Sequence, residues 1–201
     1  SQNLIQQGTV IDVLLQSLIV DKTINVNELL IGDKNAIMVA ARILGYGKEY
    51  EFEYDGIEQS VDLTKLEPIK VDFKNLPKGT NEFSYELPNS KRTITFKLLN
   101  GKDELEIEGE IKAMEKISKV QSSTLTTRFK KMILSVDGNS EKSYINNFVD
   151  NEFLSRDSLS FRQHLVKVTP DMDMKTQIID STGKETEVTI PVTVRFFWPN
   201  T

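Results

Sequence analysis

The stretch "IGDKNAIMVAARILGYG", residues 31–47, decides how the first part of the chain is organised. Asp33 is a residue type that caps helices, and Gly45 or Gly47 can supply the left-handed residue on which helices often end. The spacing predicts a helix with one apolar stripe, made of Ile37, Ala40, Ala41 and Leu44. We therefore expect a helix that begins at about Asp33 and is followed by a strand after Gly47.

A phosphate-binding loop is the alternative interpretation of these glycines. A Walker-type loop has two glycines separated by four residues, a lysine directly after the second glycine and then a Ser or Thr. Here Lys34 follows Gly32-Asp33 and no hydroxyl residue comes next. A dinucleotide loop needs three glycines at one strand-to-helix turn, whereas these lie at opposite ends of the helix. The glycines therefore indicate helix boundaries.

Two β-hairpins are predicted, one in each half of the chain. In "KEYEFEYDGIEQSVDLTKL", residues 48–66, aromatic and acidic residues alternate up to Asp55-Gly56, a strong two-residue turn signal. The closing hairpin, "KTQIIDSTGKETEVTIPV", residues 175–192, turns at residues 181–183. The four turn residues Asp55, Gly56, Thr182 and Gly183 are candidate partner contacts, because exposed hairpin edges pair readily with another chain.

The remaining segments predict more helices and a central β pair at 82–87 and 92–98. Helices are expected at about 9–19 and 101–119. A helical group then shows three apolar faces, and the first of these is Leu125, Phe129, Met132 and Ile133. The last helix is expected to open at Ser155 or Asp157 and to end at Thr169-Pro170.

These elements predict an α+β protein, with helices and peripheral β-hairpins. We expect residues 1–120 to form an N-terminal helix–hairpin and central β part. Residues 121–201 then form a helical group with a C-terminal hairpin, and one continuous domain is the alternative.

Composition excludes several kinds of site. The 201 residues include no Cys and one His, His164, so thiolate metal sites, disulfides, Cys nucleophiles and His-rich metal sites are ruled out. No Gly-x-Ser-x-Gly elbow accompanies His164, which we interpret as structural. We expect no enzyme activity and no cofactor. No apolar run approaches the roughly 20 residues of a membrane span, and no signal peptide is recognisable, so a soluble protein made inside the cell is expected.

The C-terminal "VRFFWP" is densely aromatic. Phe196, Phe197 and Trp198 must pack somewhere, because consecutive aromatic side chains are costly to leave in water. They dock either onto this protein's own core or onto a neighbouring subunit, where aromatic residues are enriched at hot spots. All three are therefore further candidate partner contacts.

Three stretches together resemble the baseplate hub subunit family of T-even-type contractile-tailed phages. They are "IGDKNAIMVAARILGYGKEYEF", "TTRFKKMILSVDGNSEKSYINNFVDNEFLSRDSLSFRQHLVKVTPDMDM" and the terminal "FFWP". The resemblance covers most of residues 29–199. It implies a structural or assembly component of the tail baseplate hub, located in the virion and made in the host cytoplasm, with no enzymatic activity. The implied partners are other baseplate and hub proteins, or further copies of this chain.

This sequence departs from the family in its hairpins. Many relatives carry a C-x-x-C-G knuckle in each hairpin, with cysteines that look able to bind zinc. Here the corresponding places read "FEYDG", 52–56, and "IDSTG", 179–183, so Phe52, Asp55, Ile179 and Thr182 stand where the thiols would be. The resemblance thus implies metal-free zinc-ribbon knuckles, whose tips are held by packing.

Three other functions compete with a hub subunit. The first is an assembly chaperone that leaves before the particle matures. The second is a nucleic-acid-binding module derived from a zinc-ribbon hairpin. The net charge of −5 weighs against it, although Arg128, Lys130 and Lys131 form a small basic cluster that could meet an acidic partner. The third, with the least support, is a hydrolase of the cell wall.

Overall fold

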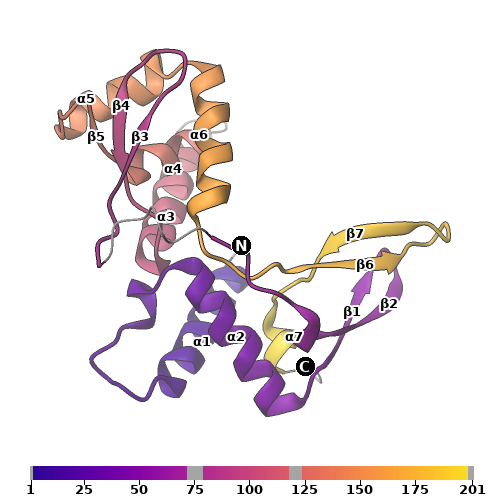
Figure 1. Cartoon of the computed structure of the whole chain (residues 1–201). Coiled ribbons are helices and arrows are strands. Elements are labelled where there is room, and N and C mark those ends of the chain that lie inside the picture. Colours follow the sequence, from indigo (N-terminus) through magenta and orange to yellow (C-terminus); the bar gives the residue numbers. More distant parts are fainter. Residues whose placement is uncertain (1, 72–78, 118–123, 199–201) are drawn as a thin grey trace. The chain divides into compact units, whose positions relative to one another are not determined.

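The chain is an α+β protein built as two units. The structure, a computed structural model, describes residues 2–71, 79–117 and 124–198. The first unit combines Ser1–Lys70 with Pro170–Thr201, and the second unit is Val71–Thr169 (Figure 1). Both ends of the chain therefore belong to the first unit. The boundary expected at residues 120–121 lies outside the described residues, within the span of the second unit.

Two helices open the first unit. Helix α1 (Gln2–Leu18) is followed by a short 3-10 helix (Val26–Glu28) and by α2 (Ile31–Tyr46). Ile11 and Leu15 of α1 and Val39 of α2 are buried in one apolar cluster. Beside that cluster, Lys34 Nζ lies 2.7 Å from Asp12 Oδ1 and joins the two helices. Lys34 thus has an internal partner, which favours helix packing over phosphate binding for this stretch.

The N-terminus of α2 differs from the expectation. The N-cap residue is Leu30, which makes no side-chain cap, so the predicted cap by Asp33 is wrong. Asp33 lies instead inside the first turn, where the helix dipole favours a carboxylate. Gly47, with φ +82°, ends the helix as predicted.

Helix α2 is also rotated relative to the predicted stripe. Ala40 is exposed and Leu44 is 88% exposed, so only Ile37 and Ala41 of the stripe pack against the core. The side chain that turns inward is Arg42, whose Nη1 and Nη2 donate to Gly47 O and Glu49 O, each at 3.0 Å. Hydrogen bonding of a long polar side chain to the segment directly after the helix therefore decides which face is buried.

The first unit also holds both predicted hairpins, each a separate two-stranded antiparallel sheet. The first hairpin is β1 (Glu49–Tyr54) and β2 (Ile57–Asp62), followed by a 3-10 turn (Leu63–Lys65). The second is β6 (Lys175–Ile179) and β7 (Glu185–Thr189), followed by α7 (Val194–Phe197). The segment after the first hairpin is bonded to the segment before the second hairpin. Ile69 N donates to Asp171 O at 2.7 Å, and Asp173 N donates to Glu67 O at 2.9 Å. These bonds tie together the two chain segments that make up the unit.

The second unit contains a three-stranded antiparallel sheet in the order β3-β4-β5. Its strands are β3 (Phe83–Glu86), β4 (Thr93–Phe96) and β5 (Ile133–Val136). The β3–β4 pair confirms the central β pair. Strand β5 was not predicted. Helix α4 (Thr124–Met132) ends before Ile133, which is the first residue of β5. The prediction that Ile133 belongs to a helical face is therefore wrong. The Asp137-Gly138 turn signal directly after this run was the missed clue.

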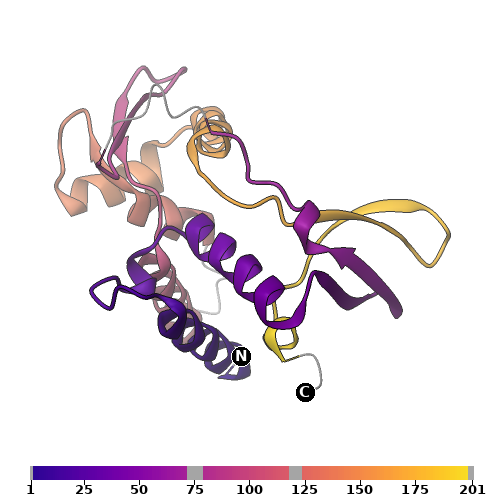
Figure 2. The ribbon, with the colours of Figure 1, turned by 60° about the horizontal axis from the view of Figure 1, so that its bottom comes forward.

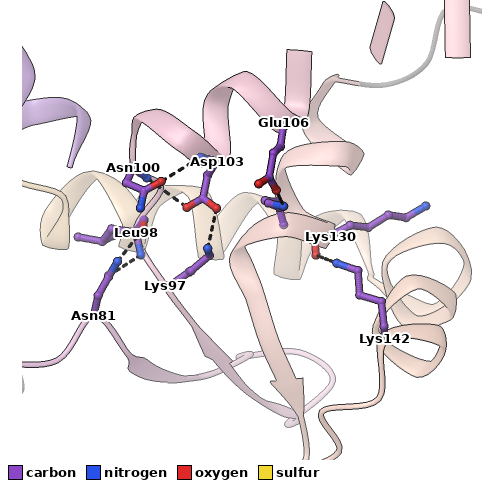
Figure 3. Close-up of polar contacts among 9 residues, drawn as sticks. Asn81, Lys97, Leu98, Asn100, Asp103, Glu106, Lys130 and Lys142 are labelled. Carbon is purple, nitrogen blue, oxygen red and sulfur yellow. Dashed lines mark hydrogen bonds and ion pairs between the residues drawn. The ribbon is translucent and has the colours of Figure 1, made fainter. Parts of the chain in front are cut away.

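Helix α3 (Gly101–Ile117) begins with a reciprocal cap (Figure 3). Asp103 N donates to Asn100 Oδ1 at 2.9 Å, and Asn100 N donates to Asp103 Oδ2 at 3.2 Å. Lys97 Nζ, 2.7 Å from Asp103 Oδ1, neutralises this carboxylate. Two orphan amides are thereby satisfied, which stabilises a helix that carries Gly109 in its interior.

The second unit is completed by α5 (Lys142–Asn147), a π-helical turn (Phe148–Glu152) and α6 (Ser155–Val168). Helix α6 starts at Ser155 after an N-cap at Leu154 that makes no side-chain bond, and it ends at Thr169 as predicted. Asp157 does not cap its own helix. Its carboxylate accepts instead from Asn89 N and Ser90 N, at 2.8 and 2.9 Å, and so anchors the β3–β4 loop on α6.

Candidate functional site: two joined hairpin tips

The turn of the first hairpin has the predicted local chemistry. Asp55 and Gly56 have φ angles of +51° and +74°, and the register places Tyr54 opposite Ile57. Two successive positive φ values define the tight hairpin turn for which Asp-Gly is strongly preferred. Both Asp55 and Gly56 are exposed at the tip.

The turn of the second hairpin is built around Asp180. Its Oδ1 accepts from Thr182 Oγ1 at 2.6 Å, from Thr182 N at 2.8 Å and from Lys184 N at 3.1 Å. The hydrogen bond from the Thr182 hydroxyl, helped by the two amides, lowers the pKa of Asp180 to about 2. Gly183 then takes φ +80°, and both Thr182 and Gly183 are exposed. The turn is therefore preorganised by an ionised carboxylate.

The two tips are joined across 126 residues of sequence. Ser181 Oγ donates to Asp55 Oδ2 at 2.9 Å, and Gln59 Nε2 donates to Ile179 O at 3.1 Å. Both hairpins project from the helical part of the first unit in the same direction, as Figure 1 and Figure 2 show. Their inward faces contribute to one buried cluster, through Phe52, Val61, Ile178 and Val188. The tips are thus held by hydrogen bonds as well as by the expected packing.

Three apolar side chains at this end remain in contact with solvent. Tyr54, Ile57 and Ile179 are 39%, 36% and 56% exposed. We call these three residues, with the turn residues Asp55, Gly56, Ser181, Thr182 and Gly183, the tip surface. The turn residues of this set were predicted from sequence. The apolar residues were missed, although a large side chain directly beside a turn is a signal that could have found them.

The aromatic tail packs onto this protein's own core, which was the first of the two expected alternatives. Phe196 and Phe197 are buried in this chain's own core, at 0% and 3% exposure. The Phe196 ring packs edge-on against Tyr50 at 4.8 Å and against Phe197 at 5.2 Å. Trp198 is partly buried against the same cluster. The tail therefore stabilises the first unit, and Phe196 and Phe197 are not free to contact a partner.

The four positions at which the sequence resemblance implied absent cysteines do not fit a structural zinc ion. Phe52 is buried in the apolar cluster, Ile179 is exposed, and Asp55 and Thr182 offer one carboxylate and one hydroxyl. Structural zinc sites use four Cys or His ligands. Across residues 2–71, 79–117 and 124–198, no three His, Cys, Asp or Glu side chains gather as a metal site.

The other sequence candidates have structural roles. His164 stacks on Tyr85 with ring centroids 4.3 Å apart, and its burial, with a smaller effect of Lys167, lowers its pKa. Burial therefore favours the neutral form of the imidazole. The three residues of the basic cluster each pair with a carboxylate: Arg128 with Glu104, Lys130 with Asp150 and Lys131 with Glu106. Internal ion pairing weakens the case for phosphate binding by this cluster.

These observations define the chain as an α+β protein whose first unit presents two joined β-hairpins. No protein-family model, curated protein or solved structure matches it. Within the described part of the chain, no helix has the length and apolarity needed to cross a bilayer.

Proposed function

We propose that this chain is a structural or assembly component of the central hub of a contractile-tail baseplate, which acts by protein–protein contact. The baseplate assignment rests on the sequence resemblance of residues 31–52 and 126–174 and of the terminal aromatic run. The mode of action rests on the tip surface, because that surface combines rigid turns with exposed apolar side chains.

The tip surface is the observation that carries the proposal. Its turns are held by the Asp180 hydrogen bonds and by the Ser181–Asp55 bond, so a partner need not pay to order them. Tyr54, Ile57 and Ile179 supply apolar area of the kind that anchors protein interfaces. A contact made by a preorganised surface of this kind suits a permanent place in a large assembly.

A triple substitution tests the role of the tip surface. Tyr54→Ser, Ile57→Thr and Ile179→Thr together are expected to lower incorporation into baseplates by about tenfold or more, because apolar anchors of an interface typically contribute about 2 kcal/mol each. Incorporation is measured by quantitative mass spectrometry of purified tail particles. The control is Val20→Thr, which changes a more exposed apolar residue of the first unit, outside the tip surface.

Normal incorporation of a folded triple variant would remove the tip surface as the contact site. Mass spectrometry of the wild-type particle also separates the hub subunit from the competing chaperone. A subunit remains in the mature particle, whereas a chaperone is found only with assembly intermediates.

A further inference from the structure

Among the described residues, strand β1 pairs with β2 alone and leaves its other edge without a strand partner. The register shows which backbone groups point toward that edge. Leu63 N donates to Lys48 O at 2.8 Å, in line with the pairing of Glu49 with Asp62. In an antiparallel ladder, hydrogen-bonded and non-hydrogen-bonded residue pairs alternate along the strands. The backbone groups of Tyr50, Phe52 and Tyr54 therefore form the hydrogen bonds to β2. The N–H and C=O groups of Glu49, Glu51 and Glu53 therefore point away from β2. Outward backbone groups that lack a strand partner are a template for another strand.

A groove runs along this edge. Consecutive residues of β1 form one wall, the segment from Pro191 to Arg195 contributes another, and the volume is about 580 Å³. Arg42, 4% exposed, lines the groove and already occupies Glu49 O through its Nη2. Its Nε has no hydrogen-bond partner in the described part of the chain. The groove thus offers the outward backbone groups of Glu51 and Glu53 to a partner.

The side chains on this edge are acidic. Glu51, Glu53 and Glu58 all line the groove and are exposed, and none of them forms an ion pair with another described residue. Glu53 and Glu58 are directly opposite each other in the register. Like charges opposite each other destabilise a sheet, so this hairpin carries a local cost that a cationic partner would relieve.

We propose that the free edge of β1 accepts an extended segment of a partner protein as an added antiparallel strand. The segment has Lys or Arg at alternate positions, opposite Glu51 and Glu53, and β-branched residues between them. This inference deepens the proposed function and rests on it in one respect, namely that the chain works by protein contact. The alternation follows from strand geometry, because residues directly opposite each other share one face of a sheet.

Capped synthetic peptides test this pairing with the full chain. The probe is a fluorescein-labelled peptide, TKVKVKT, and the readout is fluorescence anisotropy. In the antiparallel register the lysine N–H groups face β1 and the valine N–H groups face away. Methylation of the backbone amide nitrogens of the lysines is expected to weaken binding by about tenfold or more. Methylation of the backbone amide nitrogens of the valines is expected to weaken it by no more than about twofold. Equal effects of the two methylations, or the reverse order, would overturn the proposal.

The charge requirement is tested separately. The double variant Glu51→Gln and Glu53→Gln is expected to weaken binding of TKVKVKT by about tenfold, and the acidic peptide TEVEVET is expected not to bind wild-type protein. The matched control is Glu185→Gln on β7, an exposed glutamate of the other hairpin, which is expected to bind as wild type does. Equal weakening by the control variant would show that net charge, and not the edge, attracts the peptide.

The outcomes separate this inference from the proposed function. Peptide binding with the predicted methylation pattern supports the edge even if the chain is absent from tail particles. If no lysine peptide binds, the proposal of strand addition at β1 is wrong. The hub function is then tested separately, by the effect of the tip-surface variant on incorporation.

Discussion

Replacement of Gly32 with alanine is expected to lower the free energy of unfolding of the protein by about 3 kcal/mol, the upper part of the range for overpacking. A Cβ at this position would lie 2.0 Å from Pro170 O, 2.7 Å from Pro170 C and 2.8 Å from Asp171 Cα. All three are backbone atoms, which cannot rotate away as a side chain can. The substitution must therefore push α2 and the segment at Pro170 apart, and strain the 2.9 Å bond from Asn35 Nδ2 to Asp171 Oδ1.

The same helix offers a matched control for this prediction. A Cβ on Gly45 meets nothing within 4 Å, and its backbone φ is not positive. Gly45→Ala is expected to raise the free energy of unfolding by about 0.5 to 1 kcal/mol, since alanine is the better helix former. Urea denaturation of both variants provides the measurement. Similar effects of the two substitutions would mean that helix propensity, and not the approach to Pro170, governs Gly32.

Asp157→Asn is expected to destabilise the second unit by about 2 to 4 kcal/mol, because it leaves buried donors without an acceptor. The Asp157 side chain is 0% exposed and accepts from Asn89 N, Asn89 Nδ2 and Ser90 N, at 2.8, 2.8 and 2.9 Å. An asparagine keeps one oxygen and turns an NH₂ group toward a donor of the loop. The control is Asp150→Asn, which removes a solvent-exposed ion pair with Lys130 and is expected to cost less than about 1 kcal/mol.

The effect of Asp157 depends on pH in a defined direction. Burial raises the pKa of this carboxyl, but the hydrogen bonds from Asn89 and Ser90 outweigh it and hold the pKa at about 2, below the ordinary value of 3.8. A lowered folded-state pKa stabilises the protein above the unfolded value, and this stabilisation is lost as the pH falls through the folded value. The difference between wild type and Asp157→Asn should therefore be constant above about pH 5 and shrink between about pH 4 and pH 2. A difference that grows on acidification would contradict this assignment.

Much of the local structure follows from local rules. The Asp55-Gly56 turn and the turn at residues 181–183 were placed correctly, because positive φ angles at these positions demand particular residue types. Helix α3 was also predicted, and it carries an ion pair between Glu108 and Lys112, one turn apart, at 3.5 Å. The candidate site was predicted only at its turn residues. The hydrogen bond between Ser181 and Asp55 joins two segments, and nothing in the sequence of either segment indicates that they are in contact.

The errors have a common cause. Arg42 turns inward because two backbone carbonyls, of Gly47 and Glu49, are in reach, which the hydrophobic pattern of α2 does not record. Ile133 belongs to β5 because β4 offers it a hydrogen-bonding edge. Phe196 packs on Tyr50 of a distant hairpin and Phe197 packs on Phe196, so both side chains are buried within this chain. In each case a partner outside the helix or strand concerned overrides the pattern within it.

The sequence by itself determined the α+β class, the two hairpin turns, the end of α2 at Gly47 and the absence of cysteine chemistry. These depend on φ angles, on side-chain periodicity and on the residue types present, all of which are properties of short segments. Only the tertiary structure decided that the two ends of the chain form one unit, that the hairpin tips are joined, and that β1 keeps a free acidic edge. The first two features arise from contacts between residues more than a hundred positions apart, and no local pattern encodes which distant group will be the partner.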